Sequence, residues 1–370
     1  YEWYSKLVDV IMGAGFMPTS DPCVFHMWDG QDVIIISVHV DDIFAIATND
    51  RLHELVDAAL SKAFEGMDAK LTRNVGPKLS YLKMNIEQLE DGTVTVDQTV
   101  YLEKVIKQWG HGKVTGTEFS LIDPSESGSS DHPMQETYAP QIGDELPIDP
   151  TWYRGVVGAI NYAAIMTRPD LLFAMSILSA HTQAPTKLQQ RMVKRVMKYI
   201  VGTKDQKLTF KADEDWQLVA WADASFATRE NARSQSGYCF ALGADNASFH
   251  AKSQKQNLVT LSSTEAEYVA LFHTVTEVVY LRRLLEEIGF PQLPTIVFQD
   301  NQSTILWSLG QQNHKRTKHI NIKYHYIEML MQDAVIELEY LPTDIMRADL
   351  QTKPLMNSKF GDLANMHMGK

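Results

Sequence analysis

Four acidic side chains in the second half of the sequence lie where strands and helices are expected to begin or end. They are Asp223, Glu267, Asp300 and Asp349. The first and third end strand-like stretches, the second lies in the first turns of a long helical pattern, and the last follows the final strand-like stretch. Four carboxylates brought together would repel one another strongly. Divalent cations relieve such repulsion, and hard oxygen ligands select Mg²⁺ or Mn²⁺.

Two such ions, about 3.5–4 Å apart, can activate a water molecule and stabilise the leaving oxygen of a phosphodiester. The acids are therefore candidate ligands of a two-metal hydrolytic centre. The alternative is that each acid only caps a helix or ends a turn, which is a common role for a single aspartate.

The segment from Ser262 to Glu267 contains two overlapping helix-start signatures, in which an acid follows the cap residue by three positions. Steps of three or four residues from Glu267 pass along an almost wholly apolar stripe, whereas the stripe from Glu265 is mixed. An apolar stripe faces the core. We therefore expect Glu267 to point toward the sheet and Glu265 to cap the helix.

The elements that must position these side chains follow from hydrophobic periodicity, which indicates an α/β protein. Residues 33–40 and 43–47 predict two strands joined by a turn at Asp41 and Asp42, and residues 51–64 predict a helix. A helical block is expected over 151–201, three strands between 218 and 254, a long helix over 263–288, and strands at 295–299 and 335–341.

Composition limits the classes of protein that the chain can represent. The 370 residues carry a formal net charge of −12, which by itself argues against nucleic-acid binding. The charge is uneven, however: the stretches 187–211 and 311–325 are basic, and 121–150 is acidic. The basic stretches suit a nucleic-acid track, or alternatively two solvated helix faces. No apolar run is long enough to cross a bilayer, and two cysteines favour a reducing compartment over a disulfide framework.

The sequence segments around the four acids resemble the ribonuclease H domain of copia-type retrotransposons across roughly residues 216–356. The matching stretches are Trp221–Ala224, Leu261–Tyr268, Asp300–Ser303, Arg316–Ile320 and Ala348–Leu355. The resemblance implies a mixed five-stranded sheet with helices and cleavage of RNA in RNA–DNA hybrids. It also implies that Asp223, Glu267, Asp300 and Asp349 bind two Mg²⁺ or Mn²⁺ ions. Asn321 stands where the family usually has aspartate, a position outside the four ligands.

Two further regions resemble the same family. Gly158–Tyr162 and Thr167–Asp170 match its connecting region, whose basic block would follow the hybrid's phosphates. The candidate nucleic-acid contacts are Lys194, Arg195, Lys198, Arg316, Lys318 and His319. By the same resemblance, the protein would act in a cytoplasmic virus-like particle.

Residues 38–42 resemble the catalytic hairpin of the family's polymerase, with Asp41 and Asp42 as its catalytic pair. His39 replaces the usual tyrosine, and Lys83 stands where the family has glycine. The strand with the other metal-binding aspartate lies N-terminal to this hairpin in the family, so we expect a missing polymerase segment upstream in the same polyprotein. The chain alone should therefore be inactive as a polymerase.

These observations predict an α+β remnant of a polymerase palm and thumb (1–110), an acidic linker or loop (111–150), a helical connection region (151–205), a ribonuclease H-like domain (206–352) and a C-terminal tail (353–370). The main hypothesis is a metal-dependent endonuclease for RNA–DNA hybrids. The alternative is a non-catalytic remnant of a decayed element that at most binds nucleic acid. A cellular ribonuclease H with an unrelated N-terminal extension is a third hypothesis, disfavoured by the hairpin and connection matches.

Overall fold

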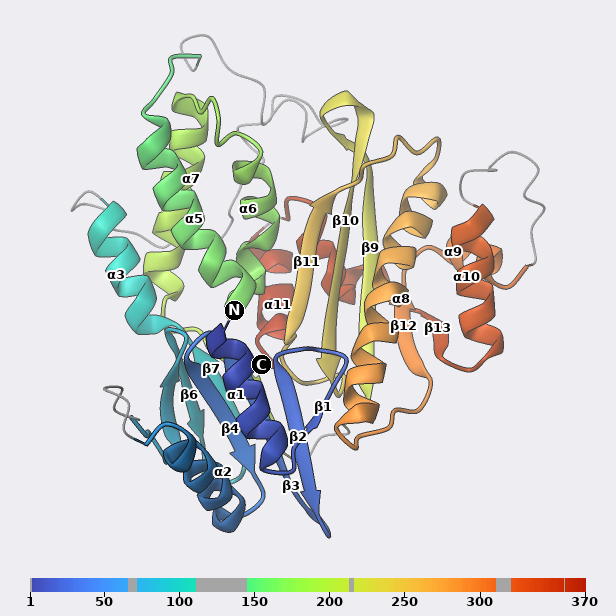
Figure 1. The fold of residues 1–370 in the computed structure, drawn as a ribbon. Helices are drawn as coiled ribbons and strands as arrows, with labels where there is room; N and C mark the ends of the chain where they lie inside the picture. Colours follow the sequence, from blue (N-terminus) through green and yellow to red (C-terminus); the bar gives the residue numbers. More distant parts are fainter. Residues whose placement is uncertain (1, 66–71, 111–144, 213–215, 311–320, 356) are drawn as a thin grey trace. The chain divides into compact units, whose positions relative to one another are not determined.

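A computed structural model describes residues 2–65, 72–110, 145–212, 216–310, 321–355 and 357–370 (Figure 1). The chain divides into two compact units. The first unit comprises Tyr1–Tyr81 with Val279–Gln292, and the second comprises Leu82–Val278 with Leu293–Lys370.

The first unit is built on an antiparallel sheet with the strand order β1-β2-β3-β4. Its elements are α1 (Glu2–Gly13), β1 (Met17–Pro18), β2 (Val24–Asp29), β3 (Asp32–His39), β4 (Asp42–Ala47), α2 (Asp50–Ala63) and β5 (Lys78–Tyr81). The expected pair of strands with a turn at Asp41 is present as β3 and β4. The expected helix is present as α2, which Asn49 caps by accepting a hydrogen bond from Leu52 N.

The second unit contains the remaining elements, although the end of the long helix α8, from Val279 on, belongs to the first unit. They are β6 (Met84–Gln88), β7 (Val94–Asp97), α3 (Thr99–Trp109), α5 (Pro150–Met166), η2 (Pro169–Leu171), α6 (Leu172–Ser179), α7 (Lys187–Thr203), β8 (Leu208–Phe210), β9 (Leu218–Arg229), η3 (Glu230–Ala232), β10 (Arg233–Leu242), β11 (His250–Lys255), α8 (Ser263–Glu287), β12 (Thr295–Gln299), α9 (Gln302–Ser308), α10 (Asn321–Gln332), β13 (Ile336–Tyr340), η4 (Thr343–Ile345), η5 (Arg347–Gln351) and α11 (Asn357–His367).

A mixed five-stranded sheet forms the centre of the second unit, in the order β11-β10-β9-β12-β13. Strands β9, β10 and β11 are antiparallel neighbours, whereas β12 runs parallel to both β9 and β13. This arrangement confirms the fold class expected from the sequence.

The two faces of β9 contact different parts of the chain, because successive side chains of a strand point to opposite faces. Ala224 packs against Ala266 and Ala270, the small residues of α8. On the other face, Val219 and Trp221 pack against the segment around η5, which includes Met346 and Ala348. The side chain of Asp223 points to the same face of β9 as those of Val219 and Trp221, and therefore toward η5.

The helices α5, α6 and α7 enclose a second core and account for the helical block expected from the sequence. At its centre, buried Arg168 forms a two-point ion pair with Asp170, which also accepts a hydrogen bond from the Tyr199 hydroxyl. Residues 353–370, expected as a tail, include helix α11, whose Phe360 and Leu363 are buried in this core.

Strand β8 lies within the expected ribonuclease H-like domain but pairs with β7 and not with the five-stranded sheet: Val94 is opposite Phe210. The domain boundaries remain predictions. Among the described residues, no helix combines the length and apolar character needed to cross a membrane.

Candidate metal centre

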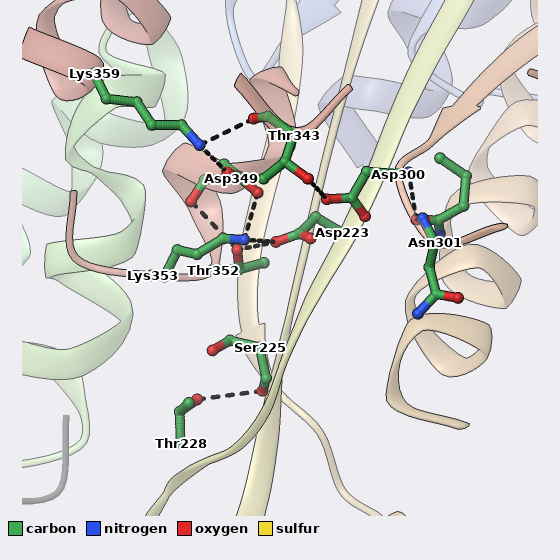
Figure 2. Close-up of polar contacts among 11 residues, drawn as sticks. Asp223, Ser225, Thr228, Asp300, Asn301, Thr343, Asp349, Thr352, Lys353 and Lys359 are labelled. Carbon is green, nitrogen blue, oxygen red and sulfur yellow. Dashed lines mark hydrogen bonds and ion pairs between the residues drawn. The ribbon is translucent and has the colours of Figure 1, made fainter. Parts of the chain in front are cut away.

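Three of the four acids singled out in the sequence converge at one edge of the five-stranded sheet (Figure 2). Asp223, Asp300 and Asp349 each contribute a carboxylate oxygen, and these oxygens all lie within 4.8 Å of one another. Asp223 and Asp349 are buried, and Asp300 is half-buried.

Strand register brings the first two together. In the parallel pair β9/β12, Ala222 is opposite Gln299, so the residues that follow, Asp223 and Asp300, are adjacent. The Gln299 side chain holds the turn after β12, because its Oε1 accepts hydrogen bonds from the backbone N–H groups of Asp300 and Asn301.

A close approach between η5 and the sheet brings in Asp349. Gly237 of β10 is opposite Asp223, and a Cβ atom added to Gly237 would lie 2.6 Å from Gln351 Cβ and 2.6 Å from Thr352 Cγ2. Only a residue without a side chain lets this segment lie so near the sheet. The Thr352 hydroxyl consequently reaches Asp223 and donates a hydrogen bond to its Oδ2.

Two lysines and a second threonine complete the surroundings of the triad. Lys353 Nζ lies 2.7 Å from Asp349 Oδ1 and 3.7 Å from Asp223 Oδ2, and Lys359 Nζ lies 2.8 Å from Asp349 Oδ2. The Thr343 hydroxyl donates to Asp300 Oδ2 at 2.7 Å (Figure 2). Both oxygens of Asp349 thus contact an ammonium group.

The two lysines do not fully offset the burial and mutual repulsion of the acids. Burial raises the pKa of Asp223 to about 7, Asp349 and Asp300 add to the rise, and Lys353 opposes it. Burial likewise raises the pKa of Glu267 well above its ordinary value, and the charges of Asp223 and Asp300 raise it further. Ionisation of these acids without further compensation is therefore unfavourable.

Glu267 is buried next to the triad on the first turns of α8. Its carboxylate forms a hydrogen bond with the backbone of Ala224, while its Oε2 has no hydrogen-bond partner among the described residues. A buried, unpartnered carboxylate oxygen is costly unless a cation or a donor binds it. Three clustered carboxylates with a fourth beside them form an all-oxygen donor set, which fits Mg²⁺ or Mn²⁺.

Glu265 caps the helix, as expected. Its Oε2 accepts a hydrogen bond from Leu261 N at 2.6 Å, and its own N–H donates to Ser262 Oγ at 3.2 Å. Both glutamates are buried, however, because every residue of α8 from Glu265 to Leu271 is buried. The expected difference in exposure between the two stripes begins only after this segment, where Val275 is buried and Thr276 is exposed.

The other candidate residues do not belong to the triad. Asp41 and Asp42 are exposed at the turn between β3 and β4, and no third acid joins them among the described residues. On α7, Lys194 is exposed, whereas Arg195 and Lys198 are half-buried. Arg316, Lys318 and His319 lie outside the described residues.

Reasoning from the sequence alone did not assign the two lysines or the two threonines. A signal existed for Lys353, because a lysine four residues after Asp349 can form an ion pair across one helical turn. Thr352 stands beside it in the same stretch. For Thr343 and Lys359, which come from η4 and α11, no comparable spacing exists.

No protein-family model matches the sequence. The chain is 30% identical, over 99% of its length, to the retrovirus-related Pol polyprotein from transposon TNT 1-94 of Nicotiana tabacum, and 31% identical over 97% to that from transposon RE2 of Arabidopsis thaliana. It spans 27% and 23%, respectively, of these two relatives.

A solved structure, the foamy viral protease–reverse transcriptase in complex with RNA/DNA hybrid, aligns with 96% of this chain and 39% of that one. The identity is 13% and the TM-score 0.47. The family follows from the sequence relatives, which match nearly the whole chain. This chain belongs to the Pol polyproteins of copia-type retrotransposons, of which it represents one segment.

Proposed function

We propose that the second unit is a ribonuclease that cleaves the RNA strand of RNA–DNA hybrids and depends on Mg²⁺ or Mn²⁺. The observation that supports this most directly is the convergence of Asp223, Asp300 and Asp349 from three separate elements, with one oxygen of each within 4.8 Å of the others. Membership of the Pol family supports RNA–DNA hybrids as its substrate class.

Asp223, Glu267, Asp300 and Asp349 would hold two divalent ions, which when bound supply the Lewis acidity that activates water and stabilises a leaving oxygen. The chain's own contribution is to fix the ligands. Thr352 and Thr343 donate hydrogen bonds to Asp223 and Asp300 and restrict their rotation. Glu267 offers a free oxygen from the helix on the other side of β9.

Binding of the hybrid would depend mainly on phosphate contacts, which position a duplex without reading its sequence. We assign these contacts to Lys194, Arg195 and Lys198 of α7, together with Arg316, Lys318 and His319. The 2′-hydroxyl groups would distinguish the RNA strand. By family, the enzyme would act in a cytoplasmic virus-like particle.

The first prediction tests the nuclease. The whole chain should nick the RNA of an RNA–DNA duplex when Mg²⁺ or Mn²⁺ is present, and Asp223→Asn should abolish the cleavage because it removes a shared ligand. Gel analysis of an end-labelled RNA strand measures both. Asp333→Asn, at an exposed acid outside the centre, is the matched control and should cleave like the parent chain.

A second candidate function is that of a binding-only remnant. The departures at His39 and Lys83 and the exposed turn at Asp41 favour it for the polymerase part. A folded protein that binds hybrid and divalent ions without cleaving would establish this reading and exclude the nuclease.

A further inference from the structure

The acidic centre contains its own cation. Among the described residues, Lys353 is the one whose ammonium lies within 4 Å of two acids of the triad, 2.7 Å from Asp349 Oδ1 and 3.7 Å from Asp223 Oδ2. Figure 2 shows it reaching between the two carboxylates, beside Thr352. It therefore bridges β9 and η5 electrostatically.

A divalent ion bound by the same acids would need the same oxygens. Two positive groups about 3–4 Å apart repel each other strongly in a partly buried site, which costs free energy. An ion and the Lys353 ammonium cannot both lie against Asp349 Oδ1 without such a cost. Movement of the lysine away from Asp349 would remove this repulsion and favour binding of the ion.

Lys359 differs from Lys353 in a way that provides a control. It contacts Asp349 alone among the acids, through Oδ2 at 2.8 Å, and also donates to the backbone carbonyl of Thr343 at 2.9 Å. Its ammonium therefore ties α11 to η4 and to one acid. The ammonium of Lys353 has no such backbone anchor among the described residues. Its side chain is 31% exposed and that of Lys359 28%, so the anchor and not the exposure distinguishes the two lysines.

We propose that Lys353 is a displaceable internal cation: it holds Asp223 and Asp349 together in the metal-free protein and leaves when a divalent ion binds. The proposal rests on the proposed metal centre and adds that Lys353 and the divalent ion compete for the same carboxylate oxygens. Lys353 is a positioning residue in this scheme, because it acts through the two acids.

The test is the affinity of the whole chain for Mn²⁺, measured by isothermal titration calorimetry. Lys353→Met keeps the apolar stem and removes the charge, so Mn²⁺ should bind about tenfold to a hundredfold more tightly than to the parent chain. Lys359→Met should change the affinity far less. Equal tightening in both variants would show a general charge effect and overturn the displacement; weaker binding by Lys353→Met would overturn it as well.

Failure of the metal centre is distinguishable from failure of this inference. If the parent chain does not bind Mn²⁺, or if Asp223→Asn does not abolish the binding, the proposed centre itself is wrong. If the parent chain binds Mn²⁺ at this centre and Lys353→Met binds no more tightly, only the inference is wrong.

A second measurement needs no variant and so does not depend on folding of Lys353→Met. Acylation by an N-hydroxysuccinimide ester, followed by mass spectrometry, reports how accessible each lysine is. Mn²⁺ should raise the acylation rate of Lys353 several-fold and leave that of exposed Lys104 on α3 unchanged. An unchanged or lower rate at Lys353, with Mn²⁺ bound, would contradict displacement.

Discussion

The two buried glutamates at the start of α8 have different hydrogen-bond partners, and this difference predicts different roles. Glu265→Gln should retain cleavage, because a glutamine oxygen can still accept the hydrogen bond from Leu261 N. Its cost in unfolding free energy should be at most about 0.5–2 kcal/mol, the scale of a lost helix cap. Glu267→Gln should lose cleavage, because it removes a proposed metal ligand with an unpartnered oxygen.

The same pair of variants provides an internal control for folding. Glu267→Gln should leave the metal-free protein as stable as the parent chain or more stable, since a buried acid whose ionisation beside Asp223 and Asp300 is unfavourable is replaced by a neutral amide. Urea unfolding in EDTA measures this. Cleavage by Glu267→Gln together with inactivity of Glu265→Gln would show that the roles assigned to the two glutamates are reversed.

The sequence was sufficient to predict the clustered acids, but not the lysines that contact them. Asp223 and Asp300 could be placed because each follows an apolar run in one of two adjacent strands. The expectation that Asp223 ends its strand was wrong, because β9 continues beyond it to Arg229. The contact of Lys353 with Asp223 depends on how η5 lies over the sheet, and a short 3₁₀ segment has no periodicity from which to predict its position.

At the scale of elements, the centre depends on the approach of η5 to β10. Gly237→Ala should force the segment 348–352 away, because the new methyl group would meet Gln351, Thr352 and the carbonyl of Ala348. We expect a loss of about 1–3 kcal/mol of stability, as in other overpacked sites. Cleavage should fall by about tenfold to a hundredfold, since Asp349 and Thr352 would move with the segment.

Gly158→Ala is the matched control for that substitution. A Cβ atom at Gly158 meets nothing within 4 Å, and the residue lies inside helix α5, where alanine is favoured by roughly 1 kcal/mol. Thermal unfolding should therefore show a small gain for Gly158→Ala. If Gly237→Ala unfolded and cleaved like the parent chain, η5 would not depend on this contact.

Long periodic elements were predictable, and short ones that depend on tertiary contacts were not. Strands β3 and β12 and helix α8 follow the expected ranges closely, because each has a continuous apolar run or stripe. Strand β8 has three residues and acquires its partner β7 from more than a hundred residues away. No local pattern distinguishes that pairing from a place in the five-stranded sheet.

At the scale of the whole molecule, the division into two units predicts which activities can be separated. The chain alone should not extend a primer on an RNA template, because Asp41 and Asp42 lie at an exposed turn without a third acid near them among the described residues. Nucleotide incorporation by the purified chain, compared with Asp41→Asn, measures this. Template-dependent extension that Asp41→Asn abolishes would contradict it.

The stability of the molecule in acid should depend on His367, the last residue of α11. Its Nδ1 lies 2.9 Å from Ser248 Oγ and its Nε2 lies 3.0 Å from the carbonyl of Arg347, so it joins α11 to η5 and to the loop before β11. Burial lowers the pKa of His367 to about 4, and the charge of Arg347 contributes to this. Between pH 6.5 and 4 the unfolded chain binds a proton that the folded chain does not.

Stability should therefore fall as the pH falls from 6.5 toward 4, by up to about 3 kcal/mol from this residue. His367→Gln cannot titrate and should lack this component, although it should lose about 1–3 kcal/mol at pH 7 because buried hydrogen bonds are disturbed. The acids of the metal centre titrate in both proteins, and their raised pKa values act in the opposite direction, so the difference between the two urea-unfolding curves at each pH isolates His367. A constant difference from pH 7 to pH 4.5 would mean that His367 becomes protonated as readily in the folded chain as in the unfolded one, and that the docking of α11 does not depend on a neutral imidazole.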